Sequence, residues 1–385
     1  MTDQQKAIEA IESLVQTCKS VKASISNHPK FLDDPPALPV LYKDLISLLS
    51  LIYGSVTKLS LALKPSSPTY SACLLPIKDI SDRIAALSHC VNMFNASVHG
   101  ATLIKETLSI VTEVVDAVEA LATTFLEIER SDLRSNRDYL VRTGAIHNII
   151  ETARSSEGLA KDNSTAIRRL WQKDAGTLED GIREVGEMIQ DAQSETDPDE
   201  EGGWDELGIG PSKPFTEDEL NRTKKVVCVK KILPCYLIFL QVLTVLRLCN
   251  LLHKKIISDI LSAPSPSLLN TALDKLAPLS PALLGASDEL ISTLDSPQDV
   301  ESIATELNAL KTVIDDIRTR LSSLKTDSGS NALLSLETDS DNALTVSLER
   351  ISLTEKAAVP TNLNPREKWF NNCFAQIAKA IQSAA

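Results

Sequence analysis

The stretch from Val300 to Leu324 carries an apolar residue at alternating three- and four-residue steps. Glu, Asp, Lys and Arg fill most of the other positions, so the pattern predicts an amphipathic helix with one apolar stripe. The stripe consists of Val300, Ile303, Leu307, Leu310, Ile314, Ile317, Leu321 and Leu324. Burying it would contribute on the order of 10–20 kcal/mol before entropy, at roughly 1.5–3 kcal/mol per side chain. Because that face must be covered, the helix requires partner helices.

The same spacing recurs along almost all of the 385 residues. Glycine accounts for only 13 residues and aromatic side chains for 4%, a composition that disfavours sheets and turn-rich folds. We therefore predict an all-α protein with two antiparallel helical bundles joined by an acidic linker. Within the first bundle, Gly100 interrupts a long stripe, which leaves open whether one helix or two cover that region. The expected ranges are 1–193 for the N-terminal bundle, 194–215 for the linker and 216–385 for the C-terminal bundle, with a polar loop around 326–345.

The predicted linker holds seven acidic residues between Glu195 and Glu206 and no Lys or Arg. Such a segment cannot bury enough apolar surface to fold alone. It also contains the apolar residues Trp204, Leu207 and Ile209. This trio could form a short docking motif for a helical groove of a partner, or Trp204 could fold back onto its own bundle.

Three hydroxyl residues in the acidic segments are candidate phosphorylation sites. Ser194, Thr196 and Thr338 each have an acidic residue three positions later, a spacing that suits acidophilic kinases.

Charge and cysteine usage bound the class of partner and the compartment. A formal charge of −13 and a pI near 5.0 argue against a protein that binds nucleic-acid backbones, which requires clustered Lys and Arg. The seven cysteines form neither a Cys-x-x-Cys pair nor a tight cluster with histidine. We therefore expect buried, reduced thiols in preference to a redox or metal site, and a cytoplasmic and nuclear protein without a signal peptide.

The most apolar stretch runs from Ile232 to Leu246. A bilayer requires ~20 apolar residues, and Pro234 and Gln241 interrupt this run. We interpret it as a helix buried inside a bundle in preference to a membrane anchor.

No pattern of catalytic or cofactor-binding residues is visible in the sequence, so we expect a non-enzymatic protein without cofactor or metal. The five histidines are isolated, and the pattern favours ordinary surface or boundary positions for them. Ser280 and Pro281 are typical of a helix N-cap followed by proline at the first helical position.

A block in the first half resembles the central part of the cyclin-D-binding (GCIP-like) family. The matching pieces are Thr143–Ile146, Ala160–Asn163, Ala166–Ile167, Leu170–Trp171 and Leu178–Val185. The acidic linker with Trp204–Leu207 and the helical half that follows are similar to fungal-type members. The resemblance implies two helical domains related in style to vinculin and talin bundles. It also implies a protein that binds D-type cyclins, helix-loop-helix transcription factors or signalling adaptors and restrains the cell cycle.

Four positions of this block are candidate family-motif residues. We expect Gly144 to allow close packing or a turn, Asp162 and Asn163 to cap a helix, and Trp171 to lie on an apolar stripe. The alternative is that these residues form a contact surface. The chain lacks a basic helix-loop-helix region and an isolated leucine zipper, which distinguishes it from the mammalian description of the family.

We therefore expect a protein-interaction regulator that resembles the cyclin-D-binding negative regulators of cell-cycle progression. Its expected partner is a cyclin-like or helix-loop-helix protein, with no direct contact to nucleic acid or membrane. The alternative is a cytoskeletal or adhesion scaffold of the vinculin or talin type, which helical-bundle architecture alone would also suit.

Overall fold

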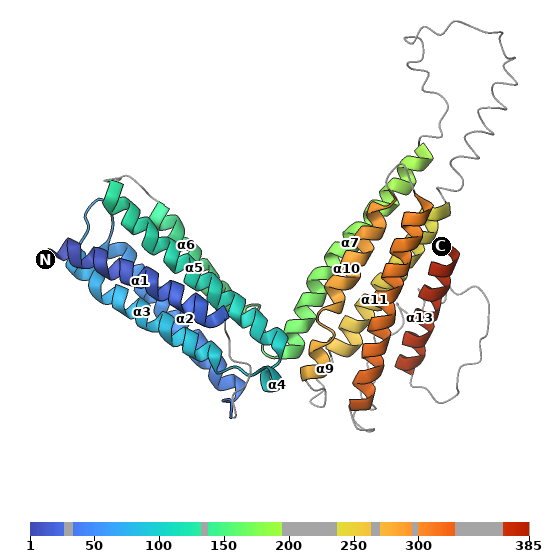
Figure 1. Ribbon diagram of the computed structural model, residues 1–385, viewed down its shortest axis with the longest axis horizontal. Coiled ribbons are helices and arrows are strands. Elements are labelled where there is room, and N and C mark those ends of the chain that lie inside the picture. Colours follow the sequence, from blue (N-terminus) through green and yellow to red (C-terminus); the bar gives the residue numbers. More distant parts are fainter. Residues whose placement is uncertain are drawn as a thin grey trace, which may run out of the picture. The chain divides into compact units, whose positions relative to one another are not determined.

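The computed structural model describes residues 1–26, 34–131, 138–194, 237–262, 270–294, 299–327 and 365–384. Every regular element in these ranges is helical, which confirms the predicted all-α class (Figure 1). By their contacts the elements form two compact units. One comprises Met1–Ile167 with Leu269–Asp274, and the other comprises Arg168–Leu268 with Lys275–Ala385.

The first unit is a helical bundle built mainly from the N-terminal part of the chain. Its elements are α1 (Asp3–Ser26), α2 (Leu38–Ala62), α3 (Tyr70–Asn92), α4 (Ala96–His99), α5 (Ala101–Ser131), α6 (Asp138–Arg154) and the short α9 (Asn270–Asp274). Helix α1 packs against α3 and α5, α2 packs against α3 and α6, and α5 packs against α6. The core lies between these helices, where their stripes of Leu, Ile and Val are buried.

Gly100 separates two helices, so the long stripe of the first bundle is not one continuous helix. Helix α3 ends at Asn92, the single-turn α4 follows, and α5 begins at Ala101. Gly100 lies between α4 and α5 with a φ of 96°, a conformation that side chains with a Cβ rarely adopt. The backbone therefore changes direction here before the 31 residues of α5 begin.

The second unit contains a helix over Leu237–Leu261, α10 (Leu279–Ser292), α11 (Val300–Asp327), α13 (Pro365–Ala384) and the part of α7 (Asn163–Ser194) that follows Ile167. The last part of the first of these helices, Ile256–Leu261, is π-helical. Helix α11 packs against α10 and α13. Every residue of its predicted stripe is buried except Val300, the first residue of the helix.

The boundary between the units differs from the predicted one. Residues 168–194 belong by their contacts to the second unit, whereas the sequence pattern assigned them to the first. The reason is that the apolar stripe of α7 supplies Trp171, Leu178 and Val185 to the buried side chains of that unit. Residues 195–215 of the predicted linker and residues 328–345 of the predicted polar loop lie outside the described part of the chain.

The apolar run around Ile232–Leu246 is a core helix where the structure describes it. Val242, Val245, Leu246, Leu248 and Cys249 are fully buried within the second unit. By length and composition alone, this helix (Leu237–Leu261) and α2 could each cross a membrane. In the most apolar stretch of each helix, 39% of α2 and 50% of Leu237–Leu261 is buried, and the buried residues belong to the core of their own unit.

Candidate functional site

The predicted docking and phosphorylation residues lie almost wholly outside the described residues. Trp204, Leu207, Ile209, Thr196 and Thr338 all fall there, and their roles stay predictions. The remaining candidate, Ser194, is the last residue of α7. The candidates whose side chains the structure describes are the four family-motif positions.

Gly144 lies in the middle of α6 and faces solvent. A Cβ built at this position would meet nothing within 4 Å. The expectation that Gly144 permits close packing or a turn is therefore wrong. Neither the fold of α6 nor its packing against α2 and α5 requires glycine here.

Asp162 and Asn163 have different roles, although they are neighbours. Asp162 caps α7, because its Oδ1 accepts a hydrogen bond from the backbone N–H of Thr165 at 2.7 Å. Asn163 is 2% exposed and bonds away from its own helix. Its Oδ1 accepts from the backbone N–H of Leu103 at 3.0 Å, and its Nδ2 donates to Oδ1 of Asp274 at 2.9 Å. The predicted cap is thus confirmed for Asp162 alone.

Asp274 completes a polar cluster at the N-terminus of α5. Its Oδ2 accepts from the backbone N–H of Ala101 at 2.7 Å. Its Oδ1 accepts from the backbone N–H and the hydroxyl of Thr102, at 3.0 and 2.8 Å. Together with Asn163, this carboxylate satisfies the first three amides of α5, which have no partner inside the helix. We call Gly100, Thr102, Asn163 and Asp274 the α5 cap cluster.

Gly100 is needed in this cluster for space as well as for its backbone conformation. A Cβ at Gly100 would collide with the side chain of Asn163. Because Asn163 is held on both sides by hydrogen bonds, it cannot move aside without breaking them. The close approach of backbone and amide therefore depends on glycine.

Trp171 lies at the centre of a buried polar network in the second unit. Its ring is fully buried and stacks on the imidazole of His253, with centroids 4.7 Å apart and planes at 22°. Its Nε1 donates to the backbone carbonyl of Leu276 at 3.3 Å. The predicted place of Trp171 on an apolar stripe is confirmed, and the stacking and the hydrogen bond add an orientation that periodicity could not reveal.

His253 and Ser280 continue this network. The hydroxyl of Ser280 donates to Oδ2 of Asp174 at 2.7 Å, which leaves its oxygen to accept from Nε2 of His253 at 2.9 Å. Nδ1 of His253 is buried and has no hydrogen-bond partner. Burial lowers the pKa of His253 to about 4, against the opposing effect of the Asp174 charge. The imidazole is therefore neutral near pH 7.

Two expectations are corrected by these positions. His253 and His99 are buried, at 1% and 3% exposure, not at the surface or boundary. Ser280 is not an N-cap, because α10 begins one residue earlier, at Leu279. Spacing alone does not distinguish a buried polar residue from an exposed one. The only sequence signal for His99 and His253 is that each lies on the apolar face of its helix, where a polar side chain is unusual.

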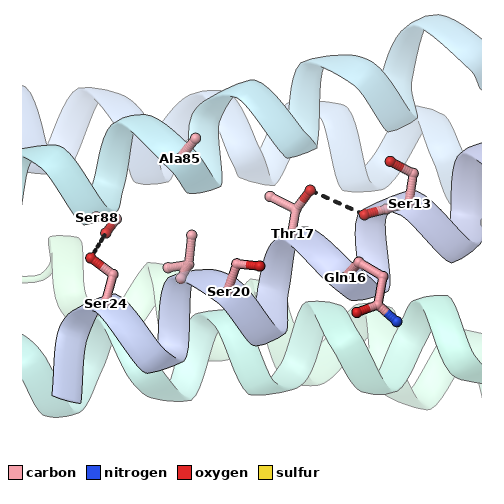
Figure 2. A pocket seen from close by; sticks show the side chains of 8 residues that line it. Ser13, Gln16, Thr17, Ser20, Ser24, Ala85 and Ser88 are labelled. Carbon is pink, nitrogen blue, oxygen red and sulfur yellow. Dashed lines mark hydrogen bonds between the residues drawn. The ribbon is translucent and has the colours of Figure 1, made fainter. Parts of the chain in front are cut away.

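A shallow groove of about 400 Å³ runs between α1 and α3 in the first unit (Figure 2). Its lining consists of Ser13, Gln16, Thr17, Ser20, Val21, Ser24, Ala85 and Ser88. The hydroxyl of Thr17 donates to the carbonyl of Ser13 in its own helix, and Ser88 donates to Ser24 (Figure 2). The lining carries no charged side chain, and the hydroxyls of Thr17, Ser24 and Ser88 are engaged within the bundle. The groove therefore presents hydroxyl and amide groups, and no charged side chain, to solvent.

Within the described ranges, no three His, Cys, Asp or Glu side chains lie close enough to hold a metal ion. The described cysteines, Cys18, Cys73, Cys90, Cys249 and Cys373, are buried free thiols. Burial raises the pKa of Cys18 to about 12 and that of Cys90 to about 11. Such thiols are protonated and weakly nucleophilic at neutral pH.

Comparison with known proteins gives one family. Residues 44–191 match the family model described as Grap2 and cyclin-D-interacting, N-terminal. The matched range includes most of α2, all of α3 to α6 and most of α7, and therefore Gly144, Asp162, Asn163 and Trp171. No curated protein matches the chain. The match over residues 44–191 supports the predicted resemblance of the chain to the Grap2 and cyclin-D-interacting (GCIP-like) family.

Proposed function

We propose that this protein is a non-enzymatic regulator that binds a cyclin of the D type, or a closely related cyclin, and thereby restrains cell-cycle progression. The single observation that carries the proposal is the family match over residues 44–191. The protein is proposed to act in the cytoplasm and the nucleus. A helix-loop-helix protein is the second candidate partner, suggested by the same family resemblance.

The described polar groups support a binding role over a catalytic one. The α5 cap cluster satisfies backbone amides, and the Asp174–Ser280–His253 network lies below the surface. A catalytic site would need titratable groups that converge on a space open to substrate. The groove between α1 and α3 is lined by uncharged side chains instead.

The partner is expected to bind an apolar surface that is exposed and is not buried in the protein's own core. Exposed large apolar side chains inside the matched range include Leu51, Leu61, Leu75, Leu140 and Val141. The predicted docking trio of Trp204, Leu207 and Ile209 begins beyond the matched range. These two sets define separate candidate contacts, one on the first unit and one on the acidic segment.

A direct binding measurement tests the proposal. The purified full chain is titrated with a purified D-type cyclin, and a B-type cyclin and a helix-loop-helix domain serve as comparison partners. Saturable binding to the D-type cyclin, with weaker binding to the B-type cyclin, is expected. Equal binding to both cyclins, or to neither, contradicts the proposal. Cosedimentation with actin filaments tests the scaffold alternative. No observation in the described ranges supports that alternative.

Variants of the same chain locate the contact. If the acidic segment docks, Trp204→Ala weakens cyclin binding about tenfold or more, because a large aromatic anchor dominates such contacts. The matched control is the double variant Leu140→Ser and Val141→Ser, which changes exposed apolar residues of α6. Loss of binding in this control alone would place the contact on the first unit and refute the docking motif. Both variants should retain the wild-type melting temperature.

A further inference from the structure

Helix α6 exposes apolar side chains on the face that is turned away from the core. Leu140 and Val141 are 52% and 71% exposed, and Gly144 and Ala145 also face solvent. A helix that only covers a core usually carries polar residues on its outer face. In α6 the apolar residues lie on both faces, because the core side holds Tyr139, Thr143, Ile146, Ile150 and Ala153. The fold of the first unit therefore leaves an apolar surface of α6 uncovered.

Helix α2 adds a large apolar side chain to this surface. The two helices are antiparallel, since the hydroxyls of Ser60 and Thr143 are 2.6 Å apart and the hydroxyl of Thr57 lies 3.1 Å from Nε2 of His147. Leu61 follows Ser60, is 72% exposed and thus lies beside the first turns of α6. We call this surface the α6 outer face, and it consists of Leu61, Leu140, Val141, Gly144 and Ala145.

Gly144 leaves a space in the α6 outer face that the protein itself does not fill. A glycine inside a helix lowers the stability of that helix relative to alanine. No neighbouring group requires it, since a Cβ at Gly144 would meet nothing within 4 Å. Without a side chain at this position, the backbone of another segment can approach α6 closely. A residue that is unfavourable for α6 alone is therefore favourable for contact with a partner.

The charged side chains that flank the α6 outer face are cations. Residues 45–63 of α2 contain Lys58 as their only charged side chain, and residues 139–150 of α6 contain only Arg142. Both cations are exposed, and no ion pair within the described residues includes either of them. Glu151, the next carboxylate of α6, already accepts a hydrogen bond from a tyrosine hydroxyl of α2 at 3.0 Å. On a chain with a formal charge of −13, this surface is locally positive.

The two cations border the apolar residues on opposite sides. Lys58 belongs to α2. Arg142 lies about 140° around α6 from His147, which contacts α2, so Arg142 is turned away from α2. An amphipathic helix has the complementary arrangement when acidic residues border its apolar stripe on both sides. The charge pattern thus selects one kind of partner for an apolar surface that would otherwise accept many.

We infer that the α6 outer face binds an amphipathic helix of a partner protein, with the helix backbone over Gly144, its apolar stripe on Leu61, Leu140 and Val141, and its acidic residues beside Lys58 and Arg142. This mode is the docking of a helix into an apolar groove, with ion pairs at the rim. The inference goes beyond the proposed cyclin binding, because it specifies the chemistry of the bound segment and does not require that a cyclin supplies it.

Two synthetic peptides test the required chemistry. The first is a fluorescein-labelled peptide of about 20 residues, long enough to form a helix, with leucine at alternating three- and four-residue steps and glutamate on both sides of the leucine stripe. The second has glutamine in place of every glutamate. In titrations of the full chain followed by fluorescence anisotropy, the acidic peptide should bind saturably and at least tenfold more tightly than the glutamine peptide, although the whole chain repels it. Absent binding of the acidic peptide, or equal binding of both, overturns the inference.

Variants of the chain locate the bound peptide. Gly144→Leu should weaken binding of the acidic peptide at least tenfold without lowering the melting temperature, because leucine favours the helix and the position is open. The double variant Lys58→Glu, Arg142→Glu should abolish the preference for the acidic peptide. Leu75→Ser is the matched control and should bind like the wild type, because it removes a similarly exposed leucine from α3, outside the α6 outer face.

The outcomes separate this inference from the proposed function. Wild-type binding of the acidic peptide by Gly144→Leu or by the charge-reversed variant would show that the peptide binds elsewhere, which refutes the inference. An equal loss in Leu75→Ser would show unspecific apolar attraction and refute it as well. A chain that binds the acidic peptide as expected but binds no D-type cyclin contradicts only the proposed function.

Discussion

Replacing Gly100 with alanine tests the account of the α5 cap cluster. Gly100 has a φ of 96°, and a Cβ there would collide with the side chain of Asn163. The variant must therefore strain the backbone and displace Asn163 from Leu103 and Asp274. We expect the first unit to lose stability while the second unit keeps its own.

The magnitude follows from two effects. A non-glycine residue in this backbone region costs about 1–3 kcal/mol. Displacing Asn163 leaves the buried amide of Leu103 without an acceptor, which costs about 1–3 kcal/mol more. The free energy of unfolding of the first unit should therefore fall by about 2–6 kcal/mol, a large part of the stability of an ordinary domain.

Gly144→Ala is the matched control, because it makes the same chemical change with the opposite expected sign. Gly144 lies inside α6, faces solvent and has open space around it. Alanine forms helix better than glycine by roughly 0.5–1 kcal/mol. This variant should therefore stabilise the first unit by about that amount.

The assay uses the distribution of tryptophan. Trp171, Trp204 and Trp369 all fall in the range of the second unit, and the first unit contains none. In urea unfolding, far-UV circular dichroism follows both units, whereas tryptophan fluorescence follows the second. Gly100→Ala should lower the urea midpoint of the first unit, which only circular dichroism detects. The fluorescence transition of the second unit should stay unchanged. A change below about 0.5 kcal/mol, or a stabilisation like that of Gly144→Ala, would refute the reasoning.

Three further predictions concern the second unit. Trp171→Ala should lower its free energy of unfolding by about 3–5 kcal/mol, because a fully buried ring is removed. Urea unfolding followed by the fluorescence of the remaining Trp204 and Trp369 should show a loss that exceeds about 2 kcal/mol. The pKa of His253 in the folded chain, about 4, lies below the unfolded value near 6.5, so the folded state binds fewer protons between these pH values. The contribution of His253 to the free energy of unfolding is therefore complete above pH 6.5. It falls by about 3 kcal/mol as the pH is lowered toward 4. The urea midpoint of His253→Gln should accordingly vary less with pH than that of the wild type. Cleavage at a protease site inserted within residues 195–215 should leave two fragments that elute together on size exclusion, since residues 168–194 belong to the second unit; fragments that separate without denaturant would contradict this.

The sequence by itself determined the class of fold and much of the core. The alternating three- and four-residue spacing predicted the helix from Val300 to Leu324, and all of that stripe except Val300 is buried. The residue types at Asp162 and Asn163 indicated a helix cap, which the structure assigns to Asp162, and the spacing placed Trp171 on an apolar stripe that is buried. These features depend on contacts within one or two helical turns, where the chain's own spacing decides which side chains share a face.

Only the tertiary structure decided which faces meet. Asn163 and Asp274 are 111 residues apart, and nothing in the local pattern of either residue indicates the other. The same holds for Ser280 with Asp174, and for the assignment of residues 168–194 to the second unit. Periodicity specifies that a helix has a buried face, but the partner of that face depends on shape and hydrogen bonding between segments distant in sequence. A buried polar residue is the extreme case, because its partner supplies the donor or acceptor that allows its burial.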